Sequence, residues 1–299
     1  MLEVIMKIFL KIALVYSSLF SLQLKGQQDL LLSCDIANDS QRIVVAGGSV
    51  AEILYFIDAD EKIVATDVTS TFPDEAQNHP SIGYVRNLSA EGILSMNPSL
   101  ILGEDDMGPP NVITQLIDIE VDIRTIPEEK SVDGILDKIY CIASILDMKS
   151  EAEEKINKTL MPDIIALENM YIKNSKRLKR VMFILSMQAN RIIVAGAGTT
   201  GDGYINLTGS KNIFGDLEGW KSVSQESIVK ENPDYIIMSQ RDLHNTETIK
   251  NVKENPIFKN IKAGEEGNFI FDDAMAMLGF GPRTIRSALQ SALIIYNDE

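Results

Sequence analysis

Short apolar runs alternate with longer amphipathic stretches along most of this 299-residue chain. The runs are rich in Val, Ile and Leu and are bounded by Gly, Pro or polar residues, which is typical of buried strands, whereas the stretches between them predict helices. Such an alternation indicates the α/β fold class. The predicted strands are Arg42–Ala46, Lys62–Thr66, Ser99–Gly103, Arg180–Ser186, Arg191–Ala195, Asp234–Ser239 and Gly267–Phe271.

An internal repeat shows that this pattern occurs twice. The segment Ser89-Ala-Glu91-Gly-Ile-Leu-Ser-Met-Asn97-Pro98 recurs 135 residues later as Ser224-Gln-Glu226-Ser-Ile-Val-Lys-Glu-Asn232-Pro233. Each copy begins with a Ser suited to N-capping, carries a Glu in the first helical turn and ends at Asn-Pro, which a helix seldom crosses. An apolar strand follows each copy. The repeat predicts two α/β lobes of similar design.

Two capping-box patterns locate further helices. Ser49-Val-Ala-Glu52 follows Gly47-Gly48 and predicts a helix that ends near Ile57, and Ser150-Glu-Ala-Glu153 lies within residues 131–178, which are almost uninterrupted helical pattern. Pro162 predicts a break or a first-turn position there. A long helix between two lobes restricts how far they can move. The expected division is an N-terminal lobe (27–148), a connecting helix (149–178) and a C-terminal lobe (179–299).

The first 26 residues predict a signal peptide and therefore export. Lys7 and Lys11 precede an apolar run at 12–22 that is shorter than the roughly 20 apolar residues needed to span a bilayer. The chain has two cysteines, Cys34 and Cys141. An exported protein can keep a disulfide, but Cys34 also ends a Leu-Leu-Ser-Cys sequence that loosely resembles a lipoprotein cleavage box. The interpretation we favour for Cys141 is a small buried hydrophobic residue in a helix.

Charge excludes some classes of partner. The chain carries 28 Lys and Arg against 43 Asp and Glu, a net charge of −15, which repels nucleic-acid phosphates and anionic lipid headgroups. With 45% hydrophobic and 24% charged residues, the composition is that of a globular protein, which we expect to be a monomer.

Motifs of common enzymes and nucleotide-binding proteins are weak or missing in the sequence. Gly196-Ala-Gly198-Thr-Thr-Gly201 matches the dinucleotide fingerprint, but the segment that follows is short and contains further glycines, so we expect a turn rather than a nucleotide site. No P-loop, HExxH or GxSxG sequence occurs. The chain has two histidines, and His79 is expected to be solvated in a polar loop. His244 follows a predicted buried strand, where its side chain would contact either a ligand or solvent.

Three motifs resemble the haem-binding subunits of bacterial ABC importers. They are Ile82-Gly-Tyr84-Val-Arg86 with Leu88-Ser-Ala-Glu91-Gly92, then Met107-Gly-Pro-Pro110, then Gly279-Phe-Gly-Pro-Arg283. The resemblance covers residues 40–298. It belongs to a wider group of binding proteins for haem, vitamin B12 and ferric siderophores. It implies two α/β lobes joined by one long helix, ferric haem as the transported ligand, a periplasmic location, and a membrane permease with its ATPase as partner.

The resemblance makes Tyr84 the proximal iron ligand and Arg86 its hydrogen-bonding or propionate partner. In an extended segment these two side chains project on the same side. A phenol binds ferric iron as phenolate, a nearby guanidinium favours that charged form, and tyrosine is a known axial haem ligand. The alternative is a surface Tyr packed beside an Arg.

Other binding roles have open alternatives. Arg283 is a candidate to grip a haem propionate through two parallel hydrogen bonds, or else a helix N-terminal residue paired with a surface acid. Met187 stands where some relatives carry a distal histidine, and its sulfur could approach iron or pack on the porphyrin. The sequence leaves open whether His244 contacts ligand, whether the iron is five- or six-coordinate, and whether one haem or two are bound.

The repeated glutamates have a role that the resemblance implies. In the wider group, the corresponding glutamates meet arginines on the permease, so Glu91 and Glu226 are expected to dock the protein at two points. Their plain alternative is stabilisation of the helix N-terminus.

The sequence thus predicts a non-enzymatic, exported haem carrier. The alternatives are a siderophore or cobalamin carrier of the same fold, a haem-dependent periplasmic enzyme or sensor, and a structural surface protein.

Overall fold

The computed structural model describes residues 32–188, 191–240 and 246–296. The predicted signal peptide, His244 and the extreme C-terminus lie outside this part of the chain. The strands are β1 (Ile43–Ala46), β2 (Ile63–Thr66), β3 (Leu100–Gly103), β4 (Ile123–Thr125), β5 (Arg180–Gln188), β6 (Arg191–Ala195), β7 (Lys211–Asn212), β8 (Trp220–Val223), β9 (Tyr235–Gln240) and β10 (Phe269–Asp273). The helices are α2 (Gly48–Phe56), α3 (Ala90–Ser95), α4 (Pro110–Asp118), α5 (Val132–Ile145), α6 (Lys149–Lys155), α7 (Met161–Asn174), α8 (Thr200–Leu207), α9 (Gln225–Glu231), α10 (Thr246–Lys253), α11 (Lys262–Glu265), α12 (Ala274–Leu278) and α13 (Pro282–Tyr296).

Each lobe is built on its own sheet. The N-terminal sheet is parallel throughout, in the order β2-β1-β3-β4. The C-terminal sheet has the order β10-β9-β5-β6-β8, with β7 paired to β5; β10, β9 and β5 are parallel, and β6 and β8 are antiparallel to their neighbours. This confirms the predicted α/β class and its two lobes.

Side chains on alternate positions of the strands pack into different layers. In β1, Ile43 and Val45 face α2 and α5, whereas Val44 and Ala46 pack with residues of α3 and α4. The first of these layers continues into the C-terminal lobe, where Phe183 of β5 belongs to the same buried cluster. One hydrophobic core therefore spans both lobes.

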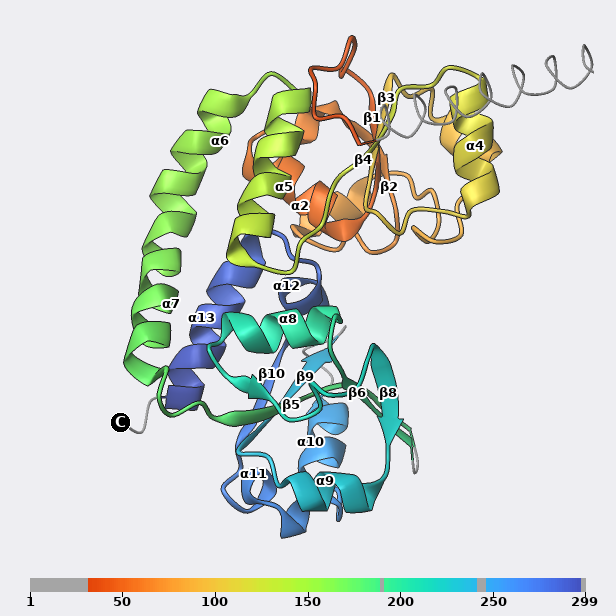
Figure 1. The fold of residues 1–299 in the computed structure, drawn as a ribbon. Coiled ribbons are helices and arrows are strands. Elements are labelled where there is room, and N and C mark those ends of the chain that lie inside the picture. The colour runs from red at the N-terminus through yellow and green to blue at the C-terminus, as the bar shows by residue number, and fades with distance from the viewer. Residues whose placement is uncertain (1–31, 189–190, 241–245, 297–299) are drawn as a thin grey trace, which may run out of the picture.

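A long helical segment joins the lobes. It runs from α6 through a π-helical segment, Ile156–Leu160, into α7, and α13 packs along α7 (Figure 1). Of the two positions predicted for Pro162, a helix break or a first turn, the structure shows the first turn of α7. Proline is tolerated there because the missing N–H would have no partner within the helix. The exact division of the chain at residues 148 and 178 stays a prediction. In the part of the chain that the structure describes, no helix is long and apolar enough to cross a membrane.

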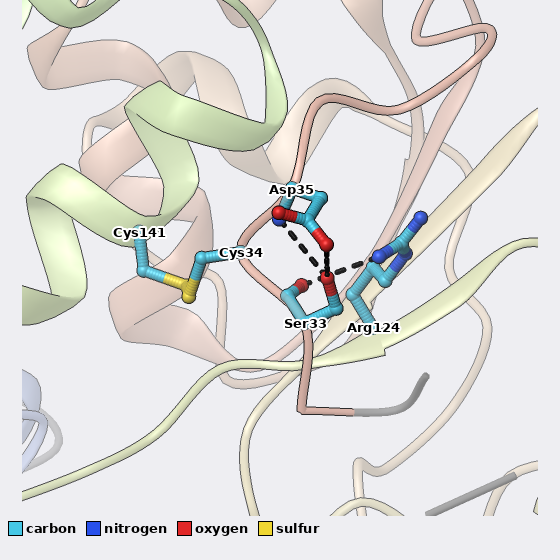
Figure 2. Close-up of a disulfide and its surroundings, with 5 residues drawn as sticks. All are labelled: Ser33, Cys34, Asp35, Arg124 and Cys141. Carbon is cyan, nitrogen blue, oxygen red and sulfur yellow. Dashed lines mark hydrogen bonds between the residues drawn. A yellow bond between two sulfur atoms is a disulfide. The ribbon is translucent and has the colours of Figure 1, made fainter. Parts of the chain in front are cut away.

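A disulfide joins Cys34 to Cys141 of α5 (Figure 2). It holds the segment before β1 against the N-terminal lobe, together with hydrogen bonds from Arg124 to the Ser33 carbonyl (3.3 Å) and from the Ala37 amide to the Ile145 carbonyl (2.9 Å). Cys141 is buried in a helix as expected, but it is bonded to Cys34 rather than packed as a free side chain. The disulfide also argues against the alternative that Cys34 is lipidated, because the sulfur that would carry the lipid is bonded to Cys141.

Both predicted capping boxes are wrong. The residue before α2 is Gly47, and Ser49 and Glu52 lie inside the helix, buried; α6 begins after Met148 without a side-chain cap. The expected turn after Gly196 is followed by a true helix, α8. Its N-terminal region already holds a carboxylate of the chain, since Asp202 accepts from the Gly198 amide (3.3 Å).

Candidate functional site

The two copies of the repeat form matching structures in the two lobes. Ser89 caps α3 by accepting from the Gly92 amide (3.3 Å), and Ser224 caps α9 by accepting from the Ser227 amide (3.2 Å). Each helix ends before an Asn with a positive φ, 51° at Asn97 and 45° at Asn232, a conformation that Asn tolerates better than most residues.

The repeated glutamates lie in the exposed first turns of these helices. Glu91 is in α3 and Glu226 is in α9. Hydrogen bonds from its own backbone and from Ser224 lower the pKa of Glu226. Both side chains are therefore available to a partner, but their docking role stays a prediction.

Tyr84 lies in a loop at the carboxyl end of the N-terminal sheet, the edge where open α/β sheets bind ligands. Its segment is fixed on both sides, because the Gly83 carbonyl accepts from the Val68 amide (2.9 Å) and the Val85 carbonyl accepts from the Gly108 amide (2.9 Å). The predicted extended geometry is wrong here. The Asn87 amide donates to the Tyr84 carbonyl (2.7 Å), so residues 84–87 form a turn.

Tyr84 is exposed on this loop, as are the apolar side chains Val68 and Phe72 on the preceding loop. Tyr84 and Phe72 are each 41% exposed and Val68 is 57% exposed, although their loops are anchored to a buried sheet. Arg86 is near Tyr84 on the same loop, and its exposed side chain donates through Nε to Asp106 (2.7 Å), which raises the pKa of Arg86. The phenol is accessible, and the neighbouring guanidinium is already paired with a carboxylate.

Arg283 lies where the two lobes meet. Its backbone amide donates to Glu52 Oε1 (2.7 Å) and its Nε donates to Glu52 Oε2 (2.8 Å). Its Nη2 is 3.1 Å from Asp273, at the end of β10, and the guanidinium carbon is 3.8 Å from the centre of the Phe72 ring. Of the two alternatives, the structure shows a helix N-terminal Arg paired with acids, although Glu52 is buried; a propionate role stays a prediction.

A second polar cluster lies beside this pair. The Ser49 amide and hydroxyl donate to Glu104 Oε1 (3.1 and 2.6 Å), and burial raises the pKa of Glu104 to about 7. The buried Lys138 ammonium donates to Glu128 (2.9 Å), to Ser49 Oγ (3.1 Å) and to the Gly279 carbonyl of the other lobe (3.3 Å).

Sequence reasoning missed this junction. Ser49 and Glu52 were assigned to a capping box, while Glu104 and Lys138 carried no motif. The available signal was a charged residue at a core-facing position of a predicted helix, as at Glu52 and Lys138.

Met187 lies apart from this junction. Met187 is half-buried against the apolar layer of the C-terminal sheet, and its sulfur accepts from the Asn255 amide group (3.6 Å). His244 lies outside the described residues. His79 is not simply solvated as expected, because its Nε2 is 3.0 Å from the Tyr55 hydroxyl and partial burial lowers its pKa. Among the described residues, no cluster of His, Cys, Asp and Glu could by itself hold a metal ion.

Comparison with known proteins gives consistent matches. The family model described as "Periplasmic binding protein" matches residues 43–276. The solved structure of the periplasmic haem-binding protein RhuT from Roseiflexus sp. RS-1 is similar, with a TM-score of 0.78, 27% identity, and coverage of 87% of this chain and 99% of that one.

Two curated relatives have lower identity. The ABC transporter substrate-binding lipoprotein YvrC of Bacillus subtilis, itself uncharacterized, is 24% identical over 88% of this chain and 82% of its own length. The vitamin B12-binding protein of Yersinia pestis is 23% identical over 68% of this chain and 71% of its own length.

Proposed function

Because this chain belongs to the periplasmic binding protein family, a family of substrate-binding transport proteins rather than enzymes, we propose that it captures ferric haem outside the cytoplasm and delivers it to the permease of an ABC importer. The observation that carries the proposal is the exposed Tyr84 phenol, fixed at the carboxyl edge of the N-terminal sheet. As phenolate it supplies the oxygen ligand that ferric haem iron accepts from tyrosine.

The surroundings of Tyr84 suit a flat, largely apolar ligand. The exposed Val68 side chain is on a loop that is hydrogen-bonded to Gly83, next to Tyr84, and covering this apolar group with a porphyrin face would remove apolar area from water. Arg86 lies two residues from Tyr84 and adds a positive charge beside the proposed ligand site.

To bind an arginine, a haem propionate would have to replace the carboxylate that now pairs with that arginine. Asp106 occupies Arg86, while Glu52 and Asp273 occupy Arg283. Since Arg86 is the more exposed of the two and has a single acidic partner, we assign the first propionate to Arg86 and keep Arg283 as the second candidate. Met187 and His244 remain candidates for the opposite haem face.

Delivery would use the matching ends of the two lobes. Glu91 and Glu226 occupy equivalent exposed first turns of α3 and α9, which suits a permease that presents two similar surfaces. The Cys34–Cys141 disulfide supports an oxidising, extracytoplasmic location.

A corrin is the alternative ligand that the similarity to a vitamin B12-binding protein favours, and a ferric siderophore is the other alternative expected from the sequence. Trp220 is the only tryptophan of the chain, so its fluorescence follows titrations with haem, cyanocobalamin and a ferric siderophore under identical conditions. Saturable quenching by ferric haem at much lower concentration than by the others is expected. Saturation by cobalamin or siderophore at the lower concentration would contradict the proposal.

A further inference from the structure

The motif Gly279-Phe-Gly-Pro-Arg283 forms the corner between α12 and α13, and the other lobe holds this corner at several points. Gly281 lies so close to α2 that a Cβ on it would be 3.2 Å from Glu52 Oε1. Phe280 has a positive φ of 49° and is fully buried in the core that spans both lobes. The corner therefore packs directly against α2, without space between them.

Two charged side chains of the N-terminal lobe bind the backbone of this corner. Glu52 accepts from the Arg283 amide, a donor in the first turn of α13 with no partner inside the helix. Lys138 donates to the Gly279 carbonyl. A carboxylate at a helix N-terminus also interacts favourably with the helix dipole. Glu52 therefore caps a helix of the other lobe.

The same carboxylate positions the Arg283 side chain. Glu52 receives both the amide and Nε of Arg283, and Asp273 lies at Nη2, so the guanidinium is held over the Phe72 ring. Burial raises the pKa of Glu52, whereas the charge of Arg283 lowers it. The buried carboxylate and the guanidinium thus depend on each other for charge compensation.

We propose that Glu52 is a cross-lobe positioning residue: by capping α13 and pairing with Arg283, it latches the Gly279–Arg283 corner to α2 and sets the placement of the two lobes around the bound ligand. This latch does not depend on which ligand is bound. Glu52→Gln keeps the shape of the side chain but removes its charge, so the corner is held less firmly.

The test measures the distance between the lobes directly. Spin labels on Gln115→Cys in α4 and Lys221→Cys in β8, both exposed, report on the two lobes by pulsed electron paramagnetic resonance of the purified protein without ligand. The native cysteines do not react with the label, because they are joined to each other. The labelled parent, which keeps Glu52, is expected to give one narrow distance distribution. The labelled protein with Glu52→Gln is expected to give a broader distribution with an additional population.

A matched control separates the latch from a general loss of an ion pair. Glu231→Gln removes the carboxylate of another Arg–Glu pair, Arg180–Glu231 (2.7 Å), which lies entirely within the C-terminal lobe. This variant is expected to leave the distance distribution unchanged. Equal distributions in Glu52→Gln and the parent, or equal broadening in Glu231→Gln, would overturn the proposal.

A second variant keeps the proposal testable if Glu52→Gln does not fold. Arg283→Lys retains the positive charge but loses the planar guanidinium that donates through Nε to Glu52 and stacks on Phe72. It is expected to broaden the same distribution, and an unchanged distribution would refute the latch. Because no ligand is present, failure of the latch is distinguishable from failure of haem binding.

Discussion

At the scale of single residues, carboxylates at the lobe junction combine burial with specific partners. Glu104 is held by Ser49, and Glu52 by Arg283. Burial raises the pKa of both carboxyl groups, so the folded protein binds these protons more tightly than the unfolded chain does. Protonation of these residues is therefore linked to stability.

Because the pKa of Glu104 is higher in the folded protein than in the unfolded chain, the folded state loses stability as the pH rises. For Glu104, the free energy of unfolding falls as pH rises from about 4.5 toward 7, by at most about 3 kcal/mol. We expect Glu104→Gln to reduce this decline, as measured by urea unfolding at pH 5 and pH 8. The exposed Glu61→Gln is the control and is expected to retain it. An undiminished decline in Glu104→Gln would show that another group is responsible.

Sequence reasoning located exposed functional candidates better than buried ones. Tyr84 and Arg86 stand in a recognisable motif, and both are exposed on one loop. Glu52 and Lys138 have partners that are distant in sequence, at Arg283 and Gly279, and local spacing carries no information about such pairs. The extended geometry expected for Tyr84 failed because a turn within residues 84–87 changes the relation between neighbouring side chains.

At the scale of elements, apolar runs located seven of the ten described strands, β1, β2, β3, β5, β6, β9 and β10. The missed strands lack such a run: β4 has only three residues, β7 has two, and β8 is Trp-Lys-Ser-Val with exposed central residues. The repeat also predicted both helices and their Ser caps correctly, because N-cap chemistry is local. The first capping box failed because tertiary contacts hold Ser49 and Glu52 in the core, and the second failed because α6 begins at Lys149, which places Ser150 inside the helix.

The disulfide is the element-scale feature with the largest expected effect on stability. It closes a loop of 107 residues, and loss of such a bond destabilises a protein by about 2–5 kcal/mol. We expect the double variant Cys34→Ser with Cys141→Ser to melt at a lower temperature than the parent. A reducing agent should lower the melting temperature of the parent but leave that of the variant unchanged. A parent whose melting temperature is insensitive to reduction would contradict this role.

At the scale of the whole molecule, one hydrophobic core joins the two lobes, and each lobe carries one copy of the repeated helix and strand. The shared core, the helical segment α6–α7 and the corner at Gly279–Arg283 all connect the lobes (Figure 1), so we expect little relative movement. We therefore expect the separation of Glu91 and Glu226 to vary little, which would lower the ordering cost of docking at two sites.

The docking role proposed for Glu91 and Glu226 can be tested separately from ligand binding. Glu91→Arg and Glu226→Arg, singly, are expected to reduce stimulation of the reconstituted importer's ATPase by the haem-loaded protein, because each reverses a charge at one contact. Haem affinity should not change. Glu247→Arg, in the exposed first turn of α10, is the control and should retain stimulation. Full stimulation by both variants would exclude these residues from the interface.

The central claim is that Tyr84 binds the iron of ferric haem, and an optical titration of the purified protein with ferric haem tests it most directly. Tyr140→Phe is the matched control, since Tyr140 is 38% exposed and Tyr84 is 41% exposed. The account predicts a saturable Soret change with a phenolate-to-iron charge-transfer band in the parent and in Tyr140→Phe. In Tyr84→Phe the band should disappear and binding should weaken on the order of tenfold or more. An unchanged band and affinity in Tyr84→Phe would contradict the account.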